Sequence, residues 1–405
     1  RIQLATLCWT LFLAGWSTLS RGSPLTNTSS FTKWNDGSVG PLIPRIQQMY
    51  HVGYTVFSLV FVFQCIGCLG GALLNILTTG LGKLLLLGSS MQAVAYTLQA
   101  AALPFPVFVL AGVINGAGLA IQDAQANGYV ASLANNSEAK MGYVQAAHGA
   151  GALVAPLMST QFAHLHHWSF HYLTSLRLML LNTVLLGVVF CGKTQDKCLS
   201  QIGQEAGETG ESEESHFRQI ISIKAVHILA LFLFVYVGVE VTIGGEVDRI
   251  LMISVHGGGA SAGYISAGSF RGLTLGHILL LPIKIGERMV VYIYGVLAIA
   301  LELVIWLVPS LIGSAIVVSL VGFVLGPIYP MSMVHAGHVF PHWLLTGSIG
   351  WIPAIATASA AVVPFVTGAI ASKTGIKSLE PVVVSRLALM LLMWRVVPAH
   401  RVKDR

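Results

Sequence analysis

Long apolar stretches recur along the whole chain and constrain its fold more than any other feature. They carry almost no charge and are joined by short polar segments. A helix of about 20 apolar residues crosses the hydrocarbon core of a bilayer, where every backbone polar group must be satisfied internally. With its 405 residues, the chain has room for about twelve such spans and their loops. We therefore expect an all-α integral membrane protein.

Composition and charge exclude the other broad classes. Only 9% of the residues are charged, whereas soluble domains carry about 25%. The net charge of +6 does not indicate nucleic-acid binding, because the basic residues lie singly near predicted helix ends and in the C-terminal tail. Five cysteines give no readable disulfide framework. Cys65 and Cys68 have redox spacing but lie in a predicted span, and we interpret them as small packing residues.

The first predicted span is interrupted. The chain begins at Arg1 rather than Met, so we expect its natural start to lie upstream. Residues 2–16 are apolar but too short for a full span, and a segment rich in Ser and Thr follows. Removing residues 17–34 would join LCWTLFLAGW to NDGSVGPLIPRIQ and give one helix of ordinary length. We interpret residues 17–34 as an insertion in helix 1.

Eleven further spans can be placed on the chain. They are predicted at about 53–77, 83–102, 107–131, 141–162, 172–190, 220–245, 260–283, 290–308, 311–335, 345–371 and 381–397. Between the sixth and seventh spans lies a polar, acidic segment, which we interpret as a flexible linker. The predicted division is an N-terminal six-helix half at 1–191, a cytoplasmic linker at 192–219, and a C-terminal half with a basic tail at 220–405.

Repeated residues and loop charges support this plan. Three residues of the first half recur 208 positions later: Gly118, Gly142 and Pro156 match Gly326, Gly350 and Pro364. A shared register in two six-helix units is typical of a duplicated transporter, although chance matches remain an alternative because glycine is common here. Basic residues fall in alternate loops on the side of the C-terminal tail, which should be cytoplasmic. We expect cytoplasmic termini, a plasma-membrane location and a monomer.

The predicted span at 107–131 contains an unusual group of polar residues, namely Gln122, Asp123, Gln125 and Asn127. A carboxylate in hydrocarbon costs about 2.5–3.5 kcal/mol on insertion scales. Asp123 either faces a water-filled solute path or is a structural acid bonded inside the bundle, and we favour the path. Residues four apart on a helix share a face, so Asp123 and Asn127 should point the same way. Glu240 is a second acid deep in a span.

Other patterns give weaker signals. His148 and His335 lie inside predicted spans, where each could bond a solute or simply satisfy a neighbouring helix. The sequence His256–Gly263 imitates an esterase motif but lacks the required strand-turn-helix context. The histidines around residues 164–171 have no nearby Cys or carboxylate, so we expect no metal site. We therefore expect neither an enzyme nor a cofactor.

Several segments together resemble a known family. The plan of two six-helix halves is similar to the major facilitator superfamily. INGAGLAIQDAQANGYVASL, WSFHYLTSL, VYVGVEVTIGG, GPIYPMSMVHAG, LLTGSIGWI and the two parts of helix 1 resemble fungal transporters of its fucose-permease-like branch. The resemblance implies that acids in helices 1 and 4 handle the proton and the sugar, and the matching positions are Asp36 and Asp123. The segment Gly71–Lys83 departs from the superfamily signature, because it lacks the Asp-Arg pair.

These observations lead to one main hypothesis and one alternative. The main hypothesis is a proton-coupled secondary transporter of a small polar, sugar-like solute, in which the two halves rock around a midplane site. Asp36, Asp123 and Glu240 would handle protons. Predicted solute-binding residues are Asn35, Gln122, Gln125, Asn127, His148 and His335. The alternative is a membrane sensor or inactive paralogue that binds solute without moving it. The predicted partners are thus a solute, protons and the lipid bilayer.

Overall fold

The structure is a computed structural model that describes residues 1–17, 42–57, 59–78, 80–163, 168–204, 216–254, 271–280, 286–308, 311–374 and 379–398. Every regular element in these ranges is a helix. Six stretches within them are long and apolar enough to cross a membrane. The predicted all-α membrane architecture is therefore confirmed. The suspected insertion lies almost entirely outside the described residues. Asn35, Asp36 and the esterase-like segment at 256–263 lie wholly outside them.

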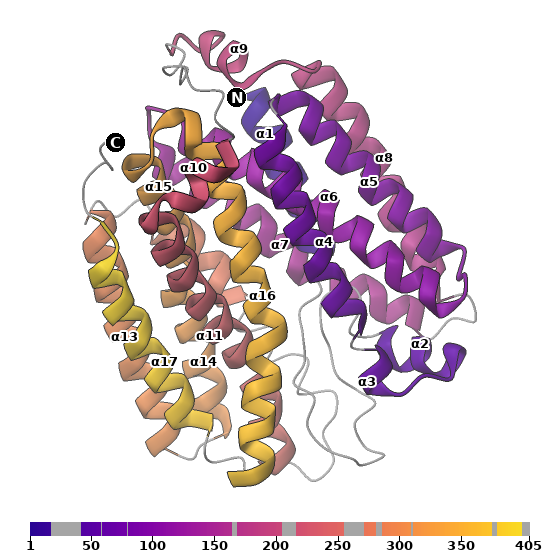
Figure 1. Cartoon of the computed structure of the whole chain (residues 1–405). Helices are drawn as coiled ribbons and strands as arrows, with labels where there is room; N and C mark the ends of the chain where they lie inside the picture. The colour runs from indigo at the N-terminus through magenta and orange to yellow at the C-terminus, as the bar shows by residue number, and fades with distance from the viewer. Residues whose placement is uncertain are drawn as a thin grey trace.

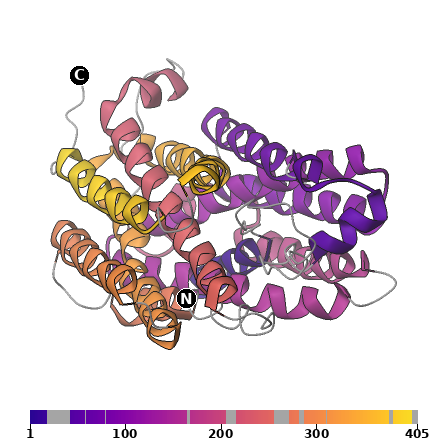
Figure 2. The same ribbon diagram turned by 90° about the horizontal axis from the view of Figure 1, so that it is seen from below.

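The helices form two groups that lie side by side (Figures 1 and 2). The first group contains α1 (Ile2–Ser17), α2 (Ile43–Tyr50), α3 (Tyr54–Phe57), α4 (Leu59–Leu77), α5 (Leu81–Ala100), α6 (Phe105–Ala131), α7 (Ser137–Ala163) and α8 (Phe170–Phe190). The second contains α11 (Lys224–Ser254), a helical segment at 271–279, α13 (Glu287–Leu307), α14 (Leu311–Leu325), α15 (Ile328–Val339), α16 (His342–Thr374) and α17 (Leu379–Val396). The short helices α9 (Gln195–Ser200) and α10 (His216–Ser222) lie between them in sequence.

Small residues bring α4 and α6 into close contact. A Cβ added at Gly67 or Gly71 of α4 would overlap the backbone carbonyl of Val113 or Ala117 on α6, and one at Gly116 would overlap the carbonyl of Gln64. Such close approach is typical of membrane helices, where association relies on van der Waals packing rather than on exclusion of water. This packing fixes α6, which carries Asp123, against its neighbours.

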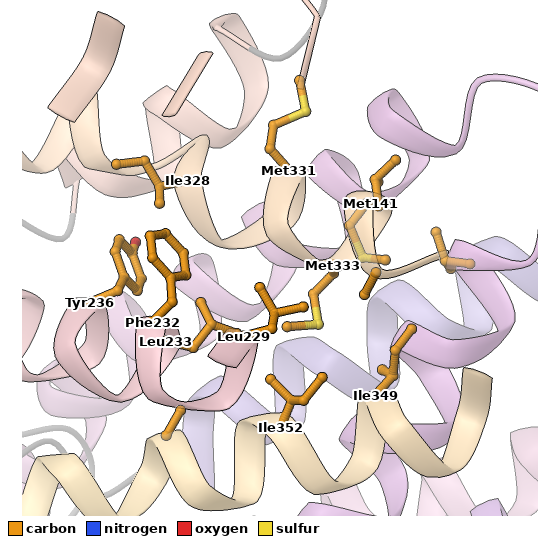
Figure 3. Close-up of a cluster of buried hydrophobic side chains, with 14 of the residues drawn as sticks. Met141, Leu229, Phe232, Leu233, Tyr236, Ile328, Met331, Met333, Ile349 and Ile352 are labelled. Atoms are coloured by element: carbon orange, nitrogen blue, oxygen red, sulfur yellow. The ribbon is translucent and has the colours of Figure 1, made fainter. Parts of the chain in front are cut away.

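The two groups join at the end of the molecule where α9 lies. Figure 3 shows part of the apolar cluster that fills this region. Met141 of α7 belongs to the same cluster as Met333 of α15, Ile349 of α16 and Leu229 of α11. A second cluster, which includes Phe57, Trp168 and Tyr172, draws its buried members from the first group alone. The first cluster therefore contains residues of both groups, whereas the buried members of the second belong to one group.

Part of the predicted flexible linker is folded onto this end. Cys198 and Leu199 of α9 are buried. The side chain of Gln204 donates to the carbonyl of Ser132 (2.7 Å) and accepts from the backbone N–H of Ala134 (3.1 Å). The apolar pair in α9 and these hydrogen bonds explain why the start of the linker is ordered. The acidic residues at 205–215 lie outside the described part.

Candidate functional site

The polar face of α6 is connected to α7 by hydrogen bonds. Asn127 Nδ2 donates to Asp123 Oδ1 at 3.0 Å, which confirms that the two residues share a face. Gln145 Nε2 of α7 donates to Asn127 Oδ1 at 2.9 Å. Asn127 and Gln145 are buried, whereas Asp123 is half-buried. The two amides orient one another and leave Asp123 with capacity for further partners, since a carboxylate can accept several hydrogen bonds.

The two neighbouring glutamines make different contacts. Gln122 accepts from Gln92 Nε2 (3.2 Å) and donates to the carbonyl of Leu85 (3.4 Å), both on α5. Gln125 donates to Asn75 Oδ1 on α4. Asn75 Nδ2 in turn donates to the carbonyl of Thr346 on α16 (3.2 Å), which connects the two halves. These contacts hold helices together, and a solute-binding role for the two glutamines stays a prediction.

Glu240 is the acid predicted for the second half. It lies on α11, one turn after Tyr236, and it is half-buried. The Tyr236 hydroxyl is in hydrogen-bond contact with the Glu240 carboxylate and with the carbonyl of Leu325 at 3.2 Å. Residues four apart share a helix face, so this pairing follows from the spacing.

Tyr329 of α15 connects the two acids. Its phenol is in electrostatic contact with both Asp123 of the first half and Glu240 of the second. α15 packs against both α6 and α7, which explains how a residue of the second half reaches Asp123. Tyr329, like the two acids, is half-buried rather than sealed in the apolar core. An acid from each half therefore lies near enough to Tyr329 to influence its phenol electrostatically.

The two predicted histidines lie in different surroundings. His148 follows Gln145 by one turn of α7, is half-buried, and has no hydrogen-bond partner on Nδ1. It is in electrostatic contact with His277 of the helical segment at 271–279. His335 lies at the end of α15, and both of its ring nitrogens already have partners. The structure thus brings His148 near the α6–α7 network and places His335 elsewhere.

The site residues predicted from the sequence did not include Gln145 or Tyr329. Gln145 gave a usable signal, because it is a polar residue inside a span and one turn before His148. Tyr329 gave little signal, because an aromatic residue in a span can serve helix packing as well as solute binding. Among the described residues, no group of three His, Cys, Asp or Glu side chains could hold a metal ion. What remains is a site suited to proton exchange and neutral hydrogen bonding.

Comparison with known proteins places the chain in a family. The sequence model of the Major Facilitator Superfamily matches residues 26–245. The chain belongs to this superfamily, and family and fold together define a multi-pass membrane protein of the secondary-transporter class.

The individual relatives are distant. The chain is 25% identical over 394 residues to "Bypass of stop codon protein 6" of Saccharomyces cerevisiae, covering 90% of this chain and 79% of that protein. FucP, the fucose:proton symporter of E. coli, superposes in its outward conformation with a TM-score of 0.75 at 16% identity, covering 98% of this chain and 99% of FucP.

Two further solved structures have the same fold. The proton:xylose symporter XylE gives a TM-score of 0.74 at 15% identity, covering 98% of this chain and 96% of XylE. The human organic anion transporter MFSD10 gives 0.73 at 14% identity, covering 97% and 98%. At these sequence identities the similarity shows the fold alone. Solved proteins with this fold include symporters of sugars and a transporter of organic anions.

Proposed function

We propose that this protein transports a small polar, sugar-like solute across the membrane by proton-coupled alternating access. The observations that carry the proposal are two half-buried acids, Asp123 on α6 and Glu240 on α11, one in each half, and the amides of Asn127 and Gln145 that are hydrogen-bonded in a chain to Asp123. Acids inside a membrane protein are costly and mark ion and proton pathways. A proton that moves among these groups would change the attraction between the halves, which is what coupling requires.

The chemistry around Asp123 supports a neutral polar solute. Asn127 and Gln145 are amides, which donate and accept hydrogen bonds without charge. In the part of the chain that the structure describes, the hydrogen bonds of Asp123, Asn127 and Gln145 involve no basic residue. A solute with several hydroxyl groups fits such surroundings better than an anion does. FucP, a fucose:proton symporter, and XylE, a proton:xylose symporter, share the fold.

The arrangement in the cell belongs to the same proposal. The α9 end, where the halves are joined, is the cytoplasmic side, because the basic loops and the tail favour that orientation. The functional units are the halves at 1–191 and 220–405, connected by the acidic linker at 192–219. The protein works as a monomer in the plasma membrane, and the halves rock around the Asp123–Tyr329–Glu240 site.

A solute screen in reconstituted vesicles tests the proposal. Radiolabelled hexoses, pentoses and polyols would be offered outside, with the outside more acidic than the inside. The proposal predicts that at least one sugar or polyol accumulates and that a protonophore abolishes the accumulation. Binding of a solute without flux would instead support a membrane sensor that does not transport, and accumulation that ignores the protonophore would exclude proton coupling.

A further inference from the structure

A second cluster of ionisable residues lies away from the solute site, where α13 begins and where α15 and α17 end. Glu287, at the start of α13, receives contacts from two histidines of α15. His335 Nδ1 lies 3.1 Å from Glu287 Oε2, and His338 Nδ1 lies 2.6 Å from Glu287 Oε1. His335 Nε2 lies 2.8 Å from the carbonyl oxygen of Pro398, just after α17. We call Glu287, His335, His338 and the Pro398 carbonyl the Glu287 clasp.

The hydrogen bonds of the clasp determine the charge of His335. Both ring nitrogens face oxygen atoms that can only accept, namely a carboxylate and a backbone carbonyl. A neutral imidazole has one N–H and one acceptor nitrogen, whereas the imidazolium donates from both. With only 3% of its surface exposed, His335 has little access to water as a substitute partner. Only the doubly protonated ring satisfies both contacts, and its bond to Glu287 is then charge-assisted.

Further contacts around the clasp connect the neighbouring ends of α13, α15 and α17. Arg288 donates to the carbonyls of Val397 (3.0 Å) and Trp394 (3.4 Å), so its guanidinium is committed to the end of α17. Trp394 Nε1 donates back to the carbonyl of Arg288 at 3.2 Å, and its ring lies 5.2 Å from that of His335. Four charged or titratable side chains make these contacts, namely Glu287, Arg288, His335 and His338.

We propose that His335 is a positioning residue for transport. As the imidazolium it ties the end of α15 to α13 and α17, and α15 carries Tyr329 six residues earlier. Loss of the proton removes one of the two contacts and frees the end of α15. The protonation of His335 then gives the transport rate a pH dependence of its own. This dependence is distinct from the one caused by the proton that is transported with the solute. The inference about transport rests on the proposed function, whereas the inference about the clasp does not.

The direction of the pH effect follows from the partners. Each contact uses an N–H of the ring, so the clasp is complete while His335 carries both protons and keeps one contact when the ring is neutral. The clasp therefore contributes more stability on the acidic side of the comparison below than on the basic side. His338 is 63% exposed on its side chain and adds less, because solvent screens its charge.

Thermal unfolding of the purified full-length protein tests the clasp without any transport assay. The melting temperatures at pH 6 and pH 8 would be compared for the parent, for His335→Gln and for His227→Gln. His227 is an exposed histidine of α11 whose Nε2 contacts the Ile221 carbonyl, so it serves as the matched control. The parent and His227→Gln should lose stability between pH 6 and pH 8, and His335→Gln should lose much less. An unchanged pH difference in His335→Gln would overturn the proposal.

Two further measurements keep the idea testable if that variant fails to fold. Glu287→Gln keeps the shape of the side chain and the imidazole but removes the negative partner, so it should show the same reduced pH difference. Solute exchange at equal pH on both sides should be several-fold faster at one pH than at the other in the parent and should vary less in Glu287→Gln. If the variant changes the pH dependence of the melting temperature but not that of solute exchange, the positioning role in transport is refuted and the clasp itself is not.

Discussion

At the scale of single residues, the account depends on one half-buried acid in each half, Asp123 and Glu240, and on the polar side chains around them. Tyr329 is in electrostatic contact with Asp123 and Glu240, and the Asn127 and Gln145 amides fix the orientation of Asp123. The spacing of Asp123 and Asn127 predicted their shared face, because helix periodicity is a local property. The convergence on Tyr329 could not be predicted, because it depends on how α15 packs between the halves.

Removing the Tyr329 hydroxyl should weaken proton coupling. Tyr329→Phe keeps the ring and its packing but removes the group that faces both carboxylates. The phenol interacts electrostatically with an acid of each half, so we expect proton-driven uptake to fall several-fold. Uptake into vesicles measures the effect. Tyr143→Phe, on an exposed position of α7, should transport like the parent; an equal loss in both variants would contradict the assignment.

At the scale of elements, the sequence predicted most helices and their approximate ends. The apolar runs are long enough to define spans, and α5, α6, α8 and α13 lie within a few residues of their predicted ranges. The predicted span at 311–335 is divided into α14 and α15 around Gly326 and Pro327. The fold of α9 was missed, because its burial depends on contacts with distant helices rather than on its own composition.

The close contact of α4 and α6 gives a prediction about folding. Gly116→Ala should reduce the yield of folded protein and the melting temperature, because the new Cβ would overlap the carbonyl of Gln64. Gly70→Ala is the matched control on α4, since a Cβ there meets no atom within 4 Å. Size-exclusion chromatography and thermal unfolding in detergent measure both variants. Equal melting temperatures for the two variants would show that the helices tolerate the wider spacing.

At the scale of the whole molecule, the two halves are joined at the α9 end by an apolar cluster and by the hydrogen bond from Asn75 to the Thr346 carbonyl. Sequence reasoning predicted two halves but could not predict which end is closed, since both conformations of a transporter use the same sequence. For His335 it left open a bond to solute or to a neighbouring helix; the structure shows contacts with Glu287 and the Pro398 carbonyl, and a role in solute binding stays a prediction. A pattern of polar residues in spans does not distinguish a site from a helix contact.

Opening of the α9 end should be visible in the reactivity of Cys198. Burial raises the pKa of the Cys198 thiol while Lys193 lowers it, and only the thiolate reacts quickly with an alkylating reagent. Asn75→Ala removes the hydrogen bond between the halves, so alkylation of Cys198 should become several-fold faster, while the exposed Cys191 should be unaffected. Mass spectrometry after timed alkylation measures both sites. Ser90→Ala, which changes only a contact within α5, should leave both rates unchanged.

The central claim is that Asp123 couples protons to solute movement. Asp123→Asn keeps the size of the side chain and can still bond Asn127, but it cannot gain or lose a proton. The most direct measurement compares this variant with the parent in vesicles, once for uptake driven by a pH gradient and once for exchange of labelled solute without a gradient. The account predicts that Asp123→Asn loses pH-driven accumulation while it retains part of the exchange. Accumulation equal to that of the parent would contradict the account and transfer the coupling role to Glu240 or Asp36.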